Sequence, residues 1–208
     1  MFLAKITKKL LVLICALIFS NPSWALFEAR IGYGALVSNP DTATLTQSPP
    51  PAALPATSAN SGIVADFFVS PPMFDLGIGF RYGKLSSSFG TSALKFDTKI
   101  TETSLLLNYR IINTLIYTGP VFTYGFSNTG SMQSIASGVT VTDFTPGSIS
   151  NYSFGWEVGL KLLTFRVGAE AGYKMLKWKD TKDSKGLLTN KNVDLSGAYL
   201  LLLFGIGI

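Results

Sequence analysis

The chain has 208 residues, one cysteine and no histidine, and its 17 Lys and Arg outnumber its 12 Asp and Glu. A chain of this length favours a single domain. Without histidine, no imidazole can activate a serine or a water, and a transition-metal site would lack its usual nitrogen donor. We therefore predict a protein that is not an enzyme and that carries no cofactor and no metal.

Residues 1–25 have the organisation of a secretory signal peptide. Lys5, Lys8 and Lys9 precede an apolar run, and Ser-Trp-Ala ends at Ala25 as a small-x-small cleavage site. Cleavage after Ala25 would remove three lysines and Cys15, which leaves 14 Lys and Arg against 12 Asp and Glu. The mature domain, residues 26–208, is thus predicted to be exported, free of thiols and nearly neutral, which argues against nucleic acid as a partner.

Strict alternation of apolar residues with small or charged ones predicts strands along the mature chain. Arg166, Glu170 and Lys174 also have helical spacing, but a helix would scatter the apolar residues and hold interior glycines at about 1 kcal/mol each. Pro120 leaves the register of its strand open, because proline cannot donate to a ladder. The eight predicted strands are 27–37, 63–70, 74–83, 101–110, 115–126, 152–162, 165–175 and 194–208.

The connections between these strands alternate in length. Long connections are expected at 38–61, 127–151 and 177–192, with a medium loop at 86–95, and tight turns at 71–72, 112–113 and 163–164. Turns on one rim and loops on the other are typical of a transmembrane barrel. We therefore predict an all-β fold, an eight-stranded antiparallel transmembrane β-barrel with short periplasmic turns and long extracellular loops. The aromatic residues near the loop ends, expected to form an interfacial girdle, are Tyr82, Tyr124, Phe126, Tyr152, Phe154, Tyr173 and Trp178.

The placement of glycine indicates which face of each strand points inward. Gly32, Gly79, Gly159 and Gly168 share the charged face, and the large aromatic residues share the other. Because an eight-stranded barrel has a narrow interior, small residues interspersed with large ones belong inside. A soluble lipid carrier would need the opposite polarity and is the disfavoured alternative.

The inward face would then hold equal numbers of opposite charges. Unpaired charges are costly away from water, so an equal count favours a closed ion-pair network. The twelve residues of this predicted lumen network are Glu28, Asp66, Asp75, Glu102, Glu157 and Glu170 with Arg30, Arg81, Arg110, Lys161, Arg166 and Lys174.

The segments "FEARIGYG", "FGWEVGLK" and "RVGAEAGYK" resemble the first, sixth and seventh strands of the small eight-stranded outer-membrane barrels of Gram-negative bacteria, in the OmpX/OmpW-like class. The resemblance covers the mature chain and implies an outer-membrane location, outer-membrane lipid and lipopolysaccharide as surroundings, and insertion by the barrel-assembly machinery. The enzymes of such barrels use a catalytic histidine, which this chain lacks. It also ends in "FGIGI" at Ile208 rather than in the aromatic residue that the assembly machinery reads.

Two functions remain open from the sequence. One is an envelope-structural or surface-interaction role for a monomer with a filled polar lumen. The other is a narrow, porin-like pore for small, apolar solutes, in which inward-facing Leu36, Val64, Phe68, Leu201 and Leu203 either form a gate or simply pack. Five lysines with a candidate role in contacting lipopolysaccharide, against the alternative of a solvated loop, are Lys177, Lys179, Lys182, Lys185 and Lys191.

Overall fold

The protein is described here from a computed structural model, which describes residues 27–40, 58–71, 75–90, 94–136, 138–184 and 191–208. The predicted signal peptide lies outside these residues. Within them no helix is long and apolar enough to cross a bilayer. The strands are β1 (Phe27–Ser38), β2 (Ser58–Val69), β3 (Leu76–Gly90), β4 (Leu94–Tyr109), β5 (Ile112–Asn113), β6 (Ile116–Ala136), β7 (Val139–Thr145), β8 (Ser148–Leu162), β9 (Phe165–Asp183), β10 (Lys191–Asp194) and β11 (Gly197–Gly207).

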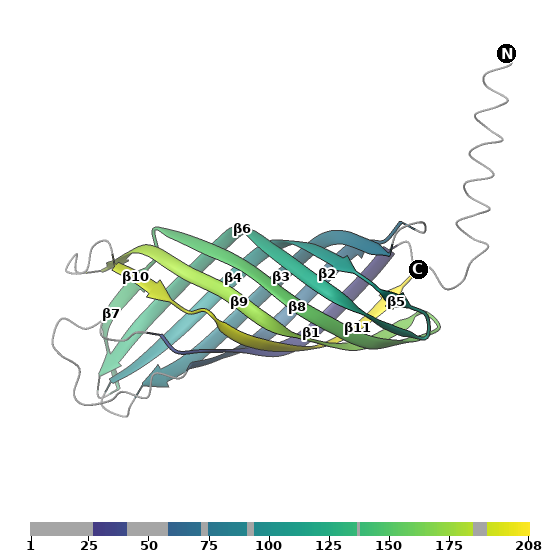
Figure 1. Ribbon diagram of the computed structural model, residues 1–208. Helices are drawn as coiled ribbons and strands as arrows, with labels where there is room; N and C mark the ends of the chain where they lie inside the picture. The colour runs from purple at the N-terminus through teal and green to yellow at the C-terminus, as the bar shows by residue number, and fades with distance from the viewer. Residues whose placement is uncertain (1–26, 41–57, 72–74, 91–93, 137, 185–190) are drawn as a thin grey trace, which may run out of the picture.

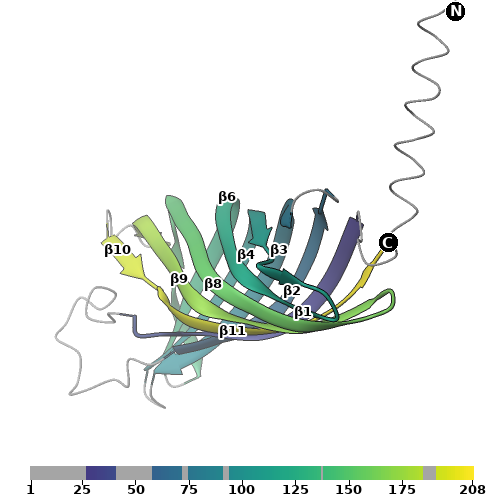
Figure 2. The ribbon, with the colours of Figure 1, turned by 45° about the vertical axis from the view of Figure 1, so that its right-hand side comes forward.

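Eight long strands form a closed antiparallel ring in the order β1, β2, β3, β4, β6, β8, β9 and β11 (Figure 1). The ring closes where β11 pairs with β1, from Glu28 opposite Gly207 to Ser38 opposite Gly197. Figure 2, turned by 45°, shows these two strands side by side. Closure leaves no unpaired edge along the body of the barrel. The predicted eight-stranded antiparallel barrel is therefore confirmed.

One end of the barrel, the turn rim, holds the short connections and the C-terminus. The Phe27 amide donates to the Ile208 carbonyl at 2.9 Å, and the Gly207 amide donates to the Thr164 carbonyl at 2.8 Å. Leu163 adopts a left-handed φ of 58°, which closes the two-residue turn between β8 and β9. The opposite end, the loop rim, carries β7 and β10 (Figure 1).

The strands extend further toward the loop rim than the sequence predicts. Much of 86–95, 127–151 and 177–192, expected as loops, is strand. Pairing continues there because large apolar side chains keep facing inward. Phe89 pairs with Phe96 across β3 and β4, and Met132 with Phe144 across β6 and β7. The outward residues of these extensions are mostly polar, with some apolar residues among them. The alternation of apolar and polar residues on which the strand prediction rests is therefore weaker there.

Strand β6 resolves the register that Pro120 left open. Pro120 lies opposite Trp156 of β8, and its neighbour Val121 is buried inside the barrel. Further along, the register against β4 shifts between Thr103 and Ser104. This irregularity is a β-bulge, which changes which residues of β6 face inward beyond that point.

The two faces of the wall differ sharply in chemistry. Many outward residues of the ring are large and apolar, and Ile31, Phe67, Phe154 and Leu202 are each more than half exposed. The inward residues include the charged set and an apolar core. The predicted polarity, with glycines and charges inside, is confirmed, whereas aromatic residues lie on both faces, since Phe68, Phe96 and Tyr117 are buried inside the barrel.

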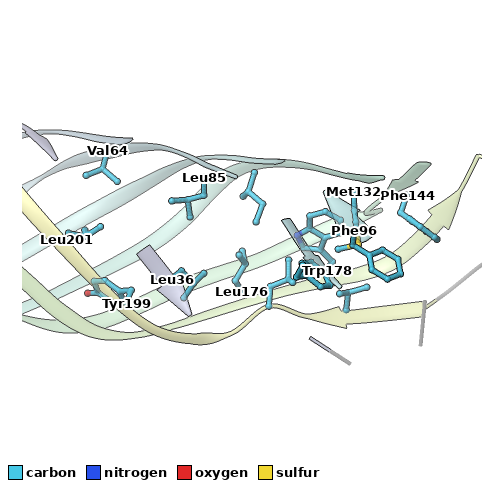
Figure 3. Close-up of a cluster of buried hydrophobic side chains, with 14 of the residues drawn as sticks. Leu36, Val64, Leu85, Phe96, Met132, Phe144, Leu176, Trp178, Tyr199 and Leu201 are labelled. Carbon is cyan, nitrogen blue, oxygen red and sulfur yellow. The ribbon is translucent and has the colours of Figure 1, made fainter. Parts of the chain in front are cut away.

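The apolar core fills the half of the interior near the loop rim (Figure 3). Trp178 is its largest member, and a Cβ atom on Gly130 would lie 2.5 Å from the indole ring. Trp178 is fully buried, so the expectation that it belongs to the outer girdle is wrong. Its position on β9 has the same parity as Lys174 and Leu176, and all three therefore point inward.

Candidate functional site: the charged interior of the barrel

The alternation of the strands places the predicted charges inside the ring. Eleven of the twelve residues are buried, and Asp75 is exposed. They come from β1, β2, β3, β4, β8 and β9, together with the segments that flank β3 and β4 at the turn rim. The set therefore spans the circumference of the barrel rather than one strand pair.

Two arginines tie the walls together in the centre. Arg30 of β1 bonds Asp66 of β2, with 2.8 Å between Nη2 and Oδ2, and also contacts Glu157 of β8. Arg81 of β3 contacts Asp66 through Nε at 2.7 Å and Glu170 of β9 through both Nη atoms at 2.8 and 2.7 Å. Strands β1 and β8 are not neighbours in the ring, and neither are β3 and β9. These ion pairs thus cross the interior as struts.

Two further ion pairs extend the network toward the rims. Arg110 donates from Nη2 to both oxygens of Glu28 at 2.8 and 2.9 Å. Lys174 donates to both oxygens of Glu102 at 2.5 and 2.6 Å, and Asn151 donates to the same carboxylate at 2.8 Å. Each of these two carboxylates accepts at least two hydrogen bonds, which help to offset the cost of removing a buried ion from water.

The structure differs from the predicted closed network at three residues of the turn rim. Among the described residues, Asp75, Lys161 and Arg166 form no ion pair with an oppositely charged side chain. Asp75 accepts a hydrogen bond from Asn113 at 2.8 Å, and the Asn113 amide oxygen accepts from Lys161. Arg166 donates to the carbonyls of Leu163 and Phe165 at 2.7 and 3.0 Å. At the turn rim, backbone carbonyls and the side-chain amide of Asn113 accept the hydrogen bonds of Arg166 and Lys161 in place of carboxylates.

Sequence reasoning missed the neutral partners of the network. Asn108 donates to Glu157, and the Tyr199 hydroxyl donates to Glu170 at 2.7 Å. Both residues are buried and share the inward parity of their strands. Inward parity alone was the signal that could have identified them, because neither carries a charge.

Large side chains occupy the space that the inward glycines leave. A Cβ atom on Gly159 would collide with the Tyr117 ring, and one on Gly168 would lie 2.5 Å from the Tyr117 hydroxyl. Leu36, Val64, Leu201 and Leu203 join the apolar core, and Phe68 packs with Leu106 and Val121. A cavity beside Arg81, Glu102, Lys174 and Tyr199 has a volume of about 20 Å³, room for about one water.

This arrangement pairs charges that come from different strands of the ring. Each of the central carboxylates, Asp66, Glu157 and Glu170, contacts an arginine. Within the described residues no group of three metal-binding side chains gathers. Chemically, the ion pairs that cross the interior can brace the wall.

The predicted lysine-rich segment lies at the loop rim. Lys177, Lys179 and Lys182 are exposed on β9, whereas Lys185 and the side chain of Lys191 lie outside the described residues. Lys177 lies 3.3 Å from Asp194. Partial burial acts to raise the pKa of Asp194, but hydrogen bonds from Ser196 and the nearby Lys177 hold it below its usual value. Lys177 is thus partly neutralised, and Lys179 and Lys182 are the more available cations.

The fold is similar to two crystal structures. Neisserial surface protein A shares 10% identity at a TM-score of 0.47, over 88% of this chain and 97% of that one. A major outer membrane protein from Thermus thermophilus shares 10% identity at a TM-score of 0.46, over 86% of this chain and 99% of that one. No protein-family model matches the chain, and no curated protein sequence matches it.

Proposed function

We propose that the protein is a non-enzymatic, integral protein of the bacterial outer membrane, with a closed lumen and a structural or surface-contact role in the envelope. The observation that carries this proposal is the distribution of polarity in the barrel. Its interior is charged and filled with side chains, whereas its exterior is apolar, the opposite of a soluble protein. A signal peptide ending at Ala25 would deliver the mature chain to the envelope.

The exposed apolar wall supports a membrane location. Soluble monomers rarely expose continuous apolar patches beyond a few hundred Å². Here outward apolar residues occur on all eight long strands, with Phe80, Tyr124 and Leu160 as examples. Tyr82, Tyr124 and Tyr173 are exposed toward the loop rim, where amphipathic rings suit the boundary between hydrocarbon and headgroups.

The packed interior favours the structural role over the alternative of a pore. The central ion pairs and the apolar core lie one above the other inside the same ring, the core toward the loop rim. A solute would have to break buried ion pairs and displace Trp178 to pass. The inward leucines, considered above as a gate, are buried members of that core and support packing.

We further propose that the exposed lysines of β9 contact lipopolysaccharide phosphates. Lys179 and Lys182 lie at the loop rim, which faces outward if the turn rim is periplasmic. Phosphate groups attract lysines near a membrane surface by about 1 kcal/mol each. Glutamine substitutions at Lys177, Lys179 and Lys182 should weaken binding to lipopolysaccharide, and unchanged binding would remove this part of the proposal.

Membrane fractionation with heat-modifiable gel mobility tests the location and the barrel together. We expect the full-length protein in the outer-membrane fraction, with a mobility that changes on boiling. Planar-bilayer recordings of the purified barrel test the closed lumen, for which we expect no reproducible conductance. Recovery in a detergent-free soluble fraction would refute the membrane location, and steady single-channel steps would refute the closed lumen.

A further inference from the structure

The outer wall of the barrel carries an apolar hollow. Its volume is about 630 Å³, and it lies over β1, β2, β3, β9 and β11. Its lining includes Ile31, Tyr33, Ile63, Ala65, Tyr82 and Leu202. Ala65 pairs with Ile31 on one side and with Tyr82 on the other. The small side chain of Ala65 therefore lies between two larger ones in this lining.

Two lysines lie on the same outer wall, on the loop-rim side of the hollow. Lys84 follows Tyr82 on the same face of β3 and pairs with Ile63, so it adjoins two residues of the lining. Its ammonium group lies over the Tyr82 ring, 6.0 Å from the centroid. Lys99 of β4 lies opposite Ser86 and diagonally across from Lys84, a separation of about 7–8 Å between backbones.

On the described outer faces of β1, β2, β3, β4 and β11, Asp97 is the one acidic side chain, and it interacts electrostatically with Lys95 and Lys99 of the same strand. Within the described residues neither Lys84 nor Lys99 forms an ion pair within 4.0 Å, and the nearby Asp97 is engaged by Lys95 at 3.2 Å. The described outer faces of β1, β2, β3 and β11 present no acidic side chain, because Glu28 and Asp66 point inward. A second copy packed on this wall through the same strands would bring no acid to meet them.

We propose that this wall binds a phosphorylated membrane lipid with a net negative charge, its phosphate between Lys84 and Lys99 and an acyl chain in the hollow beside Ala65. The proposal rests on the membrane location proposed above. Lys84, Lys95 and Lys99 against the single Asp97 leave this part of the wall with a net charge of 3 − 1 = +2. A phosphorylated lipid would balance that charge with its phosphate and fill the hollow below with hydrocarbon. The lysines of this lipid site are separate from the lysines of β9. Strands β11, β1 and β2 lie between β9 and β3 in the ring.

Lipid binding can be measured by native mass spectrometry of the full-length protein in micelles, titrated with bisphosphorylated lipid A or with phosphatidylcholine. We expect tighter binding of lipid A. The double variant Lys84→Gln/Lys99→Gln should weaken lipid A binding about tenfold or more, since each lysine contributes about 1 kcal/mol near anionic lipid. The matched variant Lys84→Arg/Lys99→Arg keeps both charges and should retain the affinity.

The hollow is tested separately by filling it. Ala65→Phe should weaken lipid binding, whereas Ala171→Phe, on the outer wall outside the lining, should not. The proposal is overturned if the glutamine pair binds as tightly as the wild type, or if Ala65→Phe and Ala171→Phe behave alike. Heat-modifiable mobility shows whether each variant is folded. Because the titration is done in micelles, its failure is distinct from failure of the fractionation experiment, which tests location alone.

Discussion

Replacing Arg81 by methionine should destabilise the barrel strongly. Arg81 makes two contacts with Asp66 and two with Glu170, all between 2.7 and 2.9 Å, in a buried setting. Asp66 would keep its ion pair with Arg30, but of its side-chain partners within the described part of the chain Glu170 would keep only the Tyr199 hydroxyl. Removing one partner of a buried ion pair typically costs about 3–5 kcal/mol, because the other charge is left uncompensated. We expect a loss of that size in the free energy of unfolding.

A second substitution distinguishes a stranded charge from lost packing. Arg81→Met combined with Glu170→Gln removes the unpaired carboxylate and should recover half or more of the loss. As a control, Lys95→Met breaks an ion pair at the surface. The side chain of Lys95 is 49% exposed and that of its partner Asp97 is 33% exposed. Exposed pairs contribute about 0–1 kcal/mol, so this variant should unfold nearly as the wild type does.

Unfolding can be measured by denaturant titration of the barrel refolded into lipid vesicles. Trp156 faces outward and Trp178 is buried inside, so fluorescence reports on both sides of the wall. Our reasoning would be refuted by a loss below about 1 kcal/mol for Arg81→Met. It would also fail if the double variant were no more stable than the single one, because the cost would then not come from the stranded Glu170.

Two other substitutions test the packing and the polarity of the wall. Gly159→Ala should destabilise the barrel by about 1–3 kcal/mol, because the added methyl group meets the Tyr117 ring. Combining it with Tyr117→Leu should cost less than the sum of the two single losses, and strict additivity in the same titration would argue against that contact. Leu202→Arg should cost about 2–4 kcal/mol in vesicles if this strand face meets hydrocarbon. Val139→Arg, exposed on β7 at the loop rim, is its control, and equal losses for the two would contradict the lipid-facing assignment.

Local periodicity in the sequence was sufficient to predict which residues face inward and which face outward over most of the wall. Alternation in segments such as 165–175 fixed which residues share a face, and the concentration of glycine and charge on one face indicated which face is inside. These features depend on a period of two along a single strand, so a sequence displays them directly. The buried positions of Arg30, Arg81, Glu157 and Glu170 follow from the same parity.

Other features depended on contacts between segments far apart in the chain. Trp178 looked like a girdle residue until the space over Gly130 and the inward parity of β9 placed it in the core. The extensions of β3, β4 and β6 toward the loop rim depend on apolar pairs such as Phe89 with Phe96, which no local pattern marks. The neutral partners Asn108 and Tyr199 were likewise invisible to a count of charges.

The sequence by itself determined the number of long strands in the ring, their inner and outer faces and the absence of a histidine-based active site, because these follow from residue type and local period. Only the tertiary structure decided which acidic side chain forms an ion pair with which basic one. Arg30 and Glu157 are 127 positions apart, and their contact depends on how eight strands close into one ring. Closure also left Lys161 and Arg166 at the turn rim without a carboxylate among the described residues, although the predicted interior held equal numbers of acids and bases.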